Sequence, residues 1–170
     1  MVGTDYSQKS IEFARRIAAS RVPPVEPPIE FVHYDIMSPL PAPSSPHGPH
    51  PLLTPPNASG YDVVLDKGTF DAISLSSDPL PGSSGRERLC EGYEERILPL
   101  VKDEGLFVVT SCNWTEEELR GWFEGRGGGD GEEGEWQFVF ETTIKYRSFR
   151  FGGREGQSIS SVCFRKRKRR

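Results

Sequence analysis

Proline is the residue that most constrains how this chain can fold. Twelve of its fifteen prolines lie between Arg21 and Gly60, and a proline removes a backbone donor and breaks a helix interior. Most of that region therefore cannot be regular structure, and the part at 38–59 is predicted to be an insertion in a surface loop. A second insertion is predicted at 121–134, where seven glycines indicate a flexible connector. The core must come from the remaining segments.

The segment before the prolines has the pattern of a strand, a helix and a second strand. Residues 2–5 read as the end of a strand. Ser7 can cap a helix that runs to about Ala19 and places one apolar face inward. The short apolar run at 29–33 predicts the second strand.

Order returns after Gly60 with two compact apolar runs. The runs at 61–65 and 106–109 are typical of strands that are covered on both faces. Between them, apolar residues recur every four positions from Leu89 and predict a helix that ends near Val101. Thr115 followed by Glu118 predicts a capping box at the start of another helix.

The last part of the chain has strand periodicity. Aromatic and β-branched residues alternate from 136 to 146, and the run at 159–164 can pair with them as a hairpin. Alternating strands and helices followed by a hairpin predict an α/β fold whose sheet is mostly parallel and has a C-terminal antiparallel hairpin.

The chain has 170 residues, enough for one ordinary domain, which we place at 1–164. No apolar stretch approaches the length of a membrane span, so no membrane association is expected. The last six residues, 165–170, are all Lys or Arg, which leaves 15 basic against 25 acidic residues in the rest. An acidic body favours a cationic partner over nucleic acid, and the run at 165–170 is predicted to be a solvated basic tail.

Cysteine and histidine usage argues against disulfides and metals. Cys90, Cys112 and Cys163 are odd in number and share no CxxC spacing, which favours a reducing compartment such as the cytoplasm. His47 and His50 lie in the proline-rich loop, where solvation is more common than metal binding. We therefore expect no metal site. We also expect a monomeric protein.

Polar residues follow four of the predicted strands: Asp5, Asp35, Asp66 and Asn113. In open α/β sheets, ligands bind outside the carboxyl ends of the strands. A carboxylate there can accept hydrogen bonds from ribose hydroxyls, although an aspartate often simply begins a turn. Asp35 with Ile36 would place a carboxylate near an exocyclic amine and an apolar side chain against a purine.

The densest signal is the segment at 66–72, Asp-Lys-Gly-Thr-Phe-Asp-Ala, directly after a buried strand. Its glycine permits a sharp turn or a close approach to a ligand, and an ordinary turn with a capping residue is the structural alternative. The segment Ser-Cys-Asn-Trp at 111–114 brings an amide and an indole to the same edge. Beside Asp66 and Phe70, Trp114 could line a slot for an alkylammonium group through cation–π contact.

Together these segments resemble the eukaryotic elongation factor 1-alpha lysine methyltransferase family, which belongs to the seven-stranded S-adenosylmethionine-dependent methyltransferases. The segments at 66–72 and 111–115 are specific, whereas the one at 3–7 is generic. The resemblance covers most of the chain outside the insertions. It is carried by Gly3–Ser7, Ser10 and Ile11, and the stretches 66–72, 111–115 and 151–154.

The resemblance implies a Rossmann-like fold, a function and roles for individual residues. The function is transfer of a methyl group from S-adenosyl-L-methionine to a lysine of elongation factor 1-alpha. The cofactor residues would be Asp5, Tyr6, Asp35, Ile36 and Asp66. The residues at the acceptor amine would be Asp66, Phe70, Asn113 and Trp114.

The chain departs from that family at its beginning. Such enzymes have an earlier strand and helix with a glycine-rich turn that wraps the methionine end of the cofactor, and no GxGxG follows a strand here. We therefore expect an incomplete seven-stranded sheet that lacks its first strand and helix. That strand would lie between the strand ending at Asp5 and the one at 61–65.

Two other functions stay open at this point. A non-catalytic binding module of the same descent would keep the acceptor residues without the cofactor turn. A nucleic-acid-directed protein is suggested only by the basic run at 165–170, which has no aromatic residue for base stacking. The same run could act as a nuclear localisation signal.

Overall fold

The computed structural model describes residues 1–38, 52–53, 57–83, 87–125, 136–147, 149–151, 154–156 and 158–169. The chain divides into two compact units, Met1–Asn57 and Ala58–Arg170, and each is described here by itself. Most of the two predicted insertions, including His47 and His50, lies outside the described residues.

The first unit is a βαβ element. Strand β1 (Val2–Asp5) leads into helix α1 (Gln8–Ser20), and strand β2 (Glu30–His33) follows. The Ser7 hydroxyl accepts a hydrogen bond from the Ser10 amide at 3.3 Å, which confirms the predicted cap. β1 and β2 pair in parallel, with Asp5 opposite His33, so both strands end at the same edge.

The second unit is built on a four-stranded sheet in the order β3-β4-β8-β5. The strands are β3 (Tyr61–Lys67), β4 (Val101–Ser111), β5 (Trp136–Ile144) and β8 (Ser160–Lys168). β3 and β4 are parallel, and β8 is antiparallel to both its neighbours. The predicted C-terminal hairpin is confirmed, but its second strand, β8, lies inside the sheet and leaves β5 at the edge. Strands β6 (Phe149–Phe151) and β7 (Arg154–Gly156) form a separate small hairpin.

Within the described residues, β3 has a strand partner on one side only, and β1 pairs only with β2. The predicted α/β fold is confirmed.

The helices of the second unit are short. They are α2 (Thr69–Leu75), α3 (Tyr93–Ile97) and α4 (Glu116–Phe123), with the 3₁₀ turns η1 (Leu89–Gly92) and η2 (Leu98–Leu100) on either side of α3. The capping box of Thr115 and Glu118 is confirmed. The single helix expected from Leu89 to about Val101 was wrong: it is three short turns, Pro99 lies in the last, and Val101 begins β4. Residues 121–123 of the predicted glycine-rich connector belong to α4.

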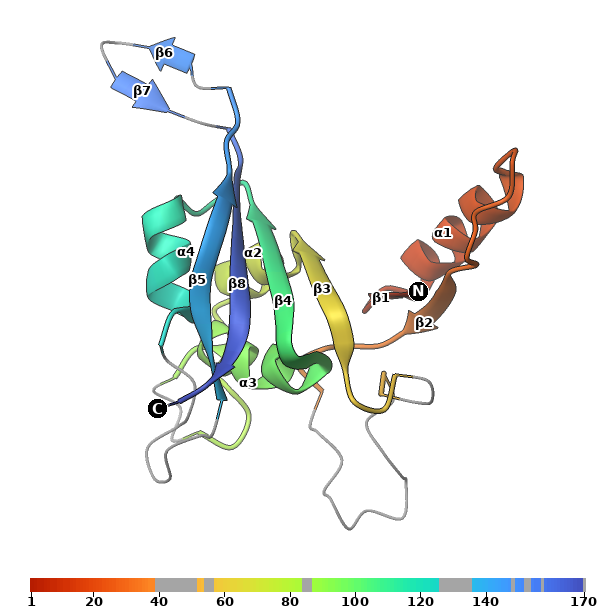
Figure 1. Cartoon of the computed structure of the whole chain (residues 1–170), viewed down its shortest axis with the longest axis horizontal. Coiled ribbons are helices and arrows are strands. Elements are labelled where there is room, and N and C mark those ends of the chain that lie inside the picture. The colour runs from red at the N-terminus through yellow and green to blue at the C-terminus, as the bar shows by residue number, and fades with distance from the viewer. Residues whose placement is uncertain are drawn as a thin grey trace. The chain divides into compact units, whose positions relative to one another are not determined.

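Aromatic side chains hold the helices to one face of this sheet. Figure 1 shows α2, α3 and α4 on the same side of the four strands. Phe123 of α4 lies with its ring centroid 5.2 Å from that of Phe107 of β4 and 4.9 Å from that of Phe70 of α2. The fully buried rings of this core are Phe70, Tyr93, Phe107, Phe123, Phe138 and Phe164. Such packing holds α2, α3 and α4 against β4, β5 and β8.

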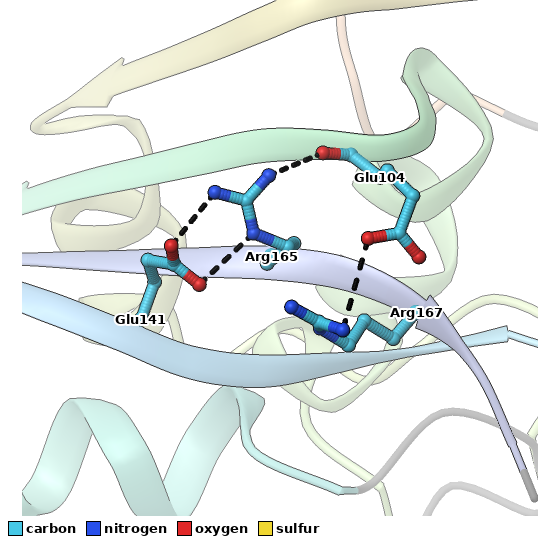
Figure 2. Close-up of polar contacts among 4 residues, drawn as sticks. All are labelled: Glu104, Glu141, Arg165 and Arg167. Carbon is cyan, nitrogen blue, oxygen red and sulfur yellow. Dashed lines mark hydrogen bonds and ion pairs between the residues drawn. The ribbon is translucent and has the colours of Figure 1, made fainter.

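The C-terminal basic run is a strand over its first four residues, and the expectation of a solvated tail at 165–170 is corrected here. Arg165 donates to both carboxylate oxygens of Glu141, at 2.9 and 2.7 Å, and to the carbonyl oxygen of Glu104 at 2.7 Å (Figure 2). Arg167 lies 3.9 Å from the Glu104 carboxylate. Lys166 is buried and donates to the Val101 carbonyl at 2.9 Å. Arg165 and Lys166 are therefore bonded to neighbouring strands, whereas Arg167 and Lys168 are exposed.

Candidate functional site

The parallel pairing of β3 and β4 creates the candidate site. Asp66 lies opposite Val109 and Lys67 opposite Thr110, so both strands end at one edge of the sheet. Because of this register, the segment at 66–72 and the turn at 111–114 meet there, as the sequence predicted.

Asp66 is buried and fully engaged at this edge. Its Oδ1 accepts a hydrogen bond from the Thr69 amide at 2.9 Å. Its Oδ2 accepts from the Phe70 amide at 3.0 Å and from the Tyr93 hydroxyl at 2.8 Å. Burial raises the pKa of Asp66, against the opposing effect of these three donors. The carboxylate therefore serves as the cap of α2, which is the structural alternative that its sequence context left open.

Gly68 explains why the cap comes from two residues upstream. It occupies the N-cap position of α2 with a φ of 84°, and it has no side chain that could accept the first amide hydrogens. A Cβ at Gly68 would meet nothing within 4 Å. Glycine is therefore needed at position 68 for its left-handed backbone conformation, and not because a described atom lies too close to leave room for a side chain.

The turn at 111–114 is held by a carboxylate that the sequence reasoning missed. The Ser111 hydroxyl donates to Asp71 of α2, and the Cys112 amide donates to the second oxygen of Asp71 at 2.9 Å. The Ser111 oxygen in turn accepts from the amides of Asn113 and Trp114, at 3.0 and 2.9 Å. The one feature of the sequence that could have indicated this role is the position of Asp71 in the first turn of α2, next to Phe70.

The aromatic residues of the predicted acceptor site divide into a buried one and a partly exposed one. Phe70 has no exposed surface, and its ring lies among those of Tyr93, Phe123 and Trp122. Its assignment as a residue at the acceptor amine stays a prediction. Trp114 is half-buried, donates from its indole nitrogen to Ser74 Oγ at 2.9 Å, and lies 6.2 Å from Phe70 between ring centroids.

Four of the five predicted cofactor residues lie in the first unit, at or just after the ends of its two strands. Asp5 Oδ1 accepts from the Ser7 amide at 2.7 Å, and the Asp5 carbonyl accepts from the Tyr34 amide at 3.0 Å. Asp35 Oδ1 accepts from the Met37 amide at 2.9 Å. Asp5 is the last residue of β1, and Asp35 lies two residues after the end of β2.

The apolar member of this group is buried and the aromatic one is exposed. Ile36 has 8% of its surface exposed, and Tyr6 has 71%. The Tyr6 carbonyl makes a hydrogen bond of 2.8 Å with the His33 ring. The roles given to Asp5 and Asp35 with these two residues, and to Asn113 and Trp114 in the second unit, stay predictions.

Other kinds of site have no support in the described part of the chain. It holds no group of three or more His, Cys, Asp and Glu side chains placed to bind a metal. None of its helices has the length and apolar character that a bilayer span requires. Cys90, Cys112 and Cys163 are all free thiols.

Comparison with known proteins identifies relatives over nearly the whole chain, although no protein-family model matches it. It is 37% identical over 164 residues to Protein-lysine N-methyltransferase EFM4 of Saccharomyces cerevisiae, which is 96% of this chain and 58% of that protein. It is 32% identical to Protein-lysine N-methyltransferase efm4 of Schizosaccharomyces pombe, again over 96% of this chain and 56% of the relative. It is 37% identical to human EEF1A lysine methyltransferase 2 over 108 residues, 64% of this chain and 39% of that one.

The βαβ units and the polar strand ends define a Rossmann-like α/β fold of the class that binds ligands at its carboxyl edge. The chain is similar in sequence to two yeast protein-lysine N-methyltransferases and to human EEF1A lysine methyltransferase 2, which confirms the resemblance seen in its motifs. A solved TehB-like SAM-dependent methyltransferase from Corynebacterium glutamicum aligns with 99% of this chain and 67% of its own, with a TM-score of 0.49 and 14% identity. The chain spans less than three fifths of the length of the two yeast relatives.

Proposed function

We propose that this chain carries the acceptor edge and part of the cofactor site of a protein-lysine N-methyltransferase that uses S-adenosyl-L-methionine and modifies elongation factor 1-alpha. The observation that carries the proposal is the 37% identity, over 96% of the chain, to a protein named as a protein-lysine methyltransferase. The shared edge of β3 and β4 supports it, because the motif residues at 66–72 and 111–114 lie together there.

The carboxylates of the first unit have the chemistry that the cofactor needs. Asp5 and Asp35 each use Oδ1 to accept one backbone amide, and the other oxygen accepts no hydrogen bond from the described residues. Asp5 would therefore accept from ribose hydroxyls, and Asp35 with Ile36 would hold the adenine. Charge-assisted bonds of this kind contribute about 1.5–3 kcal/mol each. When bound, S-adenosyl-L-methionine supplies a methyl group on a sulfonium that leaves readily.

The second unit would align the lysine amine and help it to lose a proton. Trp114 is half-buried, and a partly desolvated surface lowers the pKa of a lysine amine that lies against it. The indole face also attracts the alkylammonium form before that proton leaves. Asp66 supplies negative charge near this edge, but both its oxygens accept bonds from the protein, so its role is positioning and not proton abstraction. An in-line displacement needs little beyond such alignment.

The test is methylation of purified elongation factor 1-alpha by the purified chain, with S-adenosyl-L-methionine carrying a labelled methyl group and mass spectrometry of the lysines. Asn113→Ala is the informative variant because Asn113 is exposed at the edge, and we expect kcat/KM to fall about tenfold, the effect of about 1.4 kcal/mol. Cys112→Ala is the matched control, because its side chain is also exposed but has no predicted role.

Methylation of a lysine by wild type that Asn113→Ala weakens would support the proposal. Capture of the elongation factor without methylation, together with no cofactor binding by titration calorimetry, would replace it with a non-catalytic binding module of the same descent. Equal activity in Asn113→Ala and Cys112→Ala would remove Asn113 from the site.

The proposal includes a monomeric protein in the cytoplasm. The three free cysteines support a reducing compartment. Nuclear import through the basic run is the weaker alternative, because Arg165 and Lys166 lie in β8 and are bonded to neighbouring strands. Fluorescence microscopy of the tagged chain and analytical ultracentrifugation test these two points.

A further inference from the structure

We propose that Asp71 is the positioning residue of this site: it orients the turn at 111–114, and through it Asn113 and Trp114, without touching the substrate itself. The inference rests on the proposed function for its catalytic consequence, but the geometry on which it depends belongs to the second unit alone. Asp71 has 9% of its surface exposed and lies on α2, whereas the turn follows β4, 40 residues later.

Hydrogen-bond accounting shows why the turn needs an acceptor from α2. A serine hydroxyl has one proton to donate and two lone pairs. Ser111 accepts from the amides of Asn113 and Trp114, so both lone pairs are occupied and its proton must go to another group. Asp71 receives that proton and also the Cys112 amide hydrogen. Three consecutive amides of the turn are thereby satisfied, directly or through Ser111, by one carboxylate.

The same accounting distinguishes aspartate from its closest substitute. Both partners of Asp71 are donors, so the position needs two acceptor atoms. An asparagine offers one oxygen and one NH₂ group. Asp71→Asn would therefore point a donor either at the Cys112 amide or at the Ser111 hydroxyl. A conflict of this kind leaves a buried donor unsatisfied, which displaces the turn while hardly changing side-chain volume.

A second contact from α2 fixes the Trp114 ring. Ser74 is buried one turn after Asp71; its hydroxyl donates to the Asp71 carbonyl at 2.9 Å and accepts from the Trp114 indole nitrogen at 2.9 Å. Trp114 is therefore held at its backbone through Ser111 and at its ring by Ser74. Asp71 and Ser74 of α2 together therefore set the orientation of the Trp114 indole and of the adjacent Asn113 side-chain amide.

The experiment combines a spectroscopic readout with kinetics on the full chain. In wild type, the indole N–H signal of Trp114 in a ¹H–¹⁵N spectrum, assigned with Trp114→Phe, reports the Ser74 contact. We expect Asp71→Asn to shift that signal and to speed hydrogen exchange at the Cys112 amide by at least about tenfold. The kcat for lysine methylation should fall about tenfold or more, with the KM for S-adenosyl-L-methionine unchanged. Asp62→Asn is the charge-matched control, because Asp62 is exposed at the other end of β3.

A double-mutant cycle with Ser111→Ala tests whether the two residues act as one unit. We expect the combined variant to exchange no faster at Cys112 than the worse single variant, because the same link is already broken. Should Asp71→Asn fail to fold, Ser74→Ala must still shift the Trp114 signal if α2 is the support.

An unchanged Trp114 signal and Cys112 exchange rate in Asp71→Asn would overturn the inference, as would a displaced turn that leaves kcat intact. If wild type methylates nothing, the proposed function fails. The spectroscopic arm then still decides whether Asp71 orients the turn.

Discussion

Replacing Tyr93 by phenylalanine removes one hydrogen bond from a buried carboxylate and almost nothing else. The Tyr93 hydroxyl donates to Asp66 Oδ2 at 2.8 Å, and both residues are buried. The ring lies 5.5 Å from that of Phe70 and 6.2 Å from that of Phe123. Phenylalanine keeps this packing, so the variant isolates the bond to the charge.

The expected cost follows from the charge state of Asp66. A hydrogen bond to an ionised group contributes about 1.5–3 kcal/mol, against about 0.5–1.5 kcal/mol for a neutral pair. After Tyr93→Phe, the Asp66 carboxylate keeps its bonds from Thr69 and from the Phe70 amide. We expect a loss of about 2 kcal/mol in the free energy of unfolding near neutral pH. With a urea slope of about 2 kcal/mol/M, the midpoint falls by about 1 M.

The cost should depend on pH in a defined direction. Burial raises the pKa of Asp66 in the folded chain above its ordinary value of 3.8, and the bond from Tyr93 opposes that rise. An acid with a raised folded pKa stabilises the fold below its unfolded pKa and loses that contribution as pH rises through the folded pKa. Tyr93→Phe raises the folded pKa further, so this loss becomes larger. The difference between wild type and variant therefore grows from about pH 4 towards neutrality.

The assay is urea unfolding followed by circular dichroism at several pH values between 4 and 8. Tyr146→Phe is the matched control, because the Tyr146 hydroxyl bonds to the neutral Ser161 hydroxyl at 2.9 Å and its loss should cost the same at every pH. A destabilisation by Tyr93→Phe that is independent of pH, or smaller near neutrality than in acid, would refute the reasoning about Asp66.

Three further predictions concern the sheet. Gly60→Ala should destabilise the chain by about 1–3 kcal/mol or more in urea unfolding, since the φ of Gly60 is 93° and a Cβ would lie 2.8 Å from a backbone nitrogen. Gly82→Ala is the control: Gly82 has a φ of 86° but open space around it, so the stability lost in this variant reports backbone strain alone. Lys166→Met should cost about 1–3 kcal/mol in urea unfolding because it deletes the bond to the Val101 carbonyl but keeps the apolar stem. Truncation before Arg165 should abolish the cooperative unfolding transition that circular dichroism records. A transition like that of wild type would show that this end of β8 is dispensable.

Local signals were sufficient for the capped helices. Ser7 bonds to an amide three residues on, and Thr115 and Glu118 satisfy each other across the same spacing. The compact apolar runs likewise predicted β3 and the buried part of β4. The expectation that β3 is covered on both faces was wrong, because Val63 and Leu65 are 48% and 76% exposed. In each case the partners are near in sequence, so the residue types and their spacing were enough.

The contacts that define the site are between residues distant in sequence. Tyr93 meets Asp66 across 27 positions, and Asp71 meets Ser111 across 40. An aspartate in the first turn of a helix is compatible with solvent, a cap or a buried partner. The register of β3 on β4 brings α2 next to the turn at 111–114, so Asp71 has a buried partner there.

The basic run shows the same division between local pattern and tertiary packing. Six consecutive cations predict a solvated tail by composition, because isolated charges are costly to bury. In the fold, Arg165 finds Glu141 across 24 positions and the Glu104 carbonyl across 61.

The sequence by itself determined the α/β class, the family resemblance and the position of the polar strand ends, because these depend on spacing along the chain. Only the tertiary structure decided that Asp66 is a cap, that Phe70 is fully buried among other rings and that Asp71 holds the turn at 111–114. Whether a carboxylate or a cation is solvated or bonded depends on which strand lies next to it, and that neighbour is set by packing of the whole sheet.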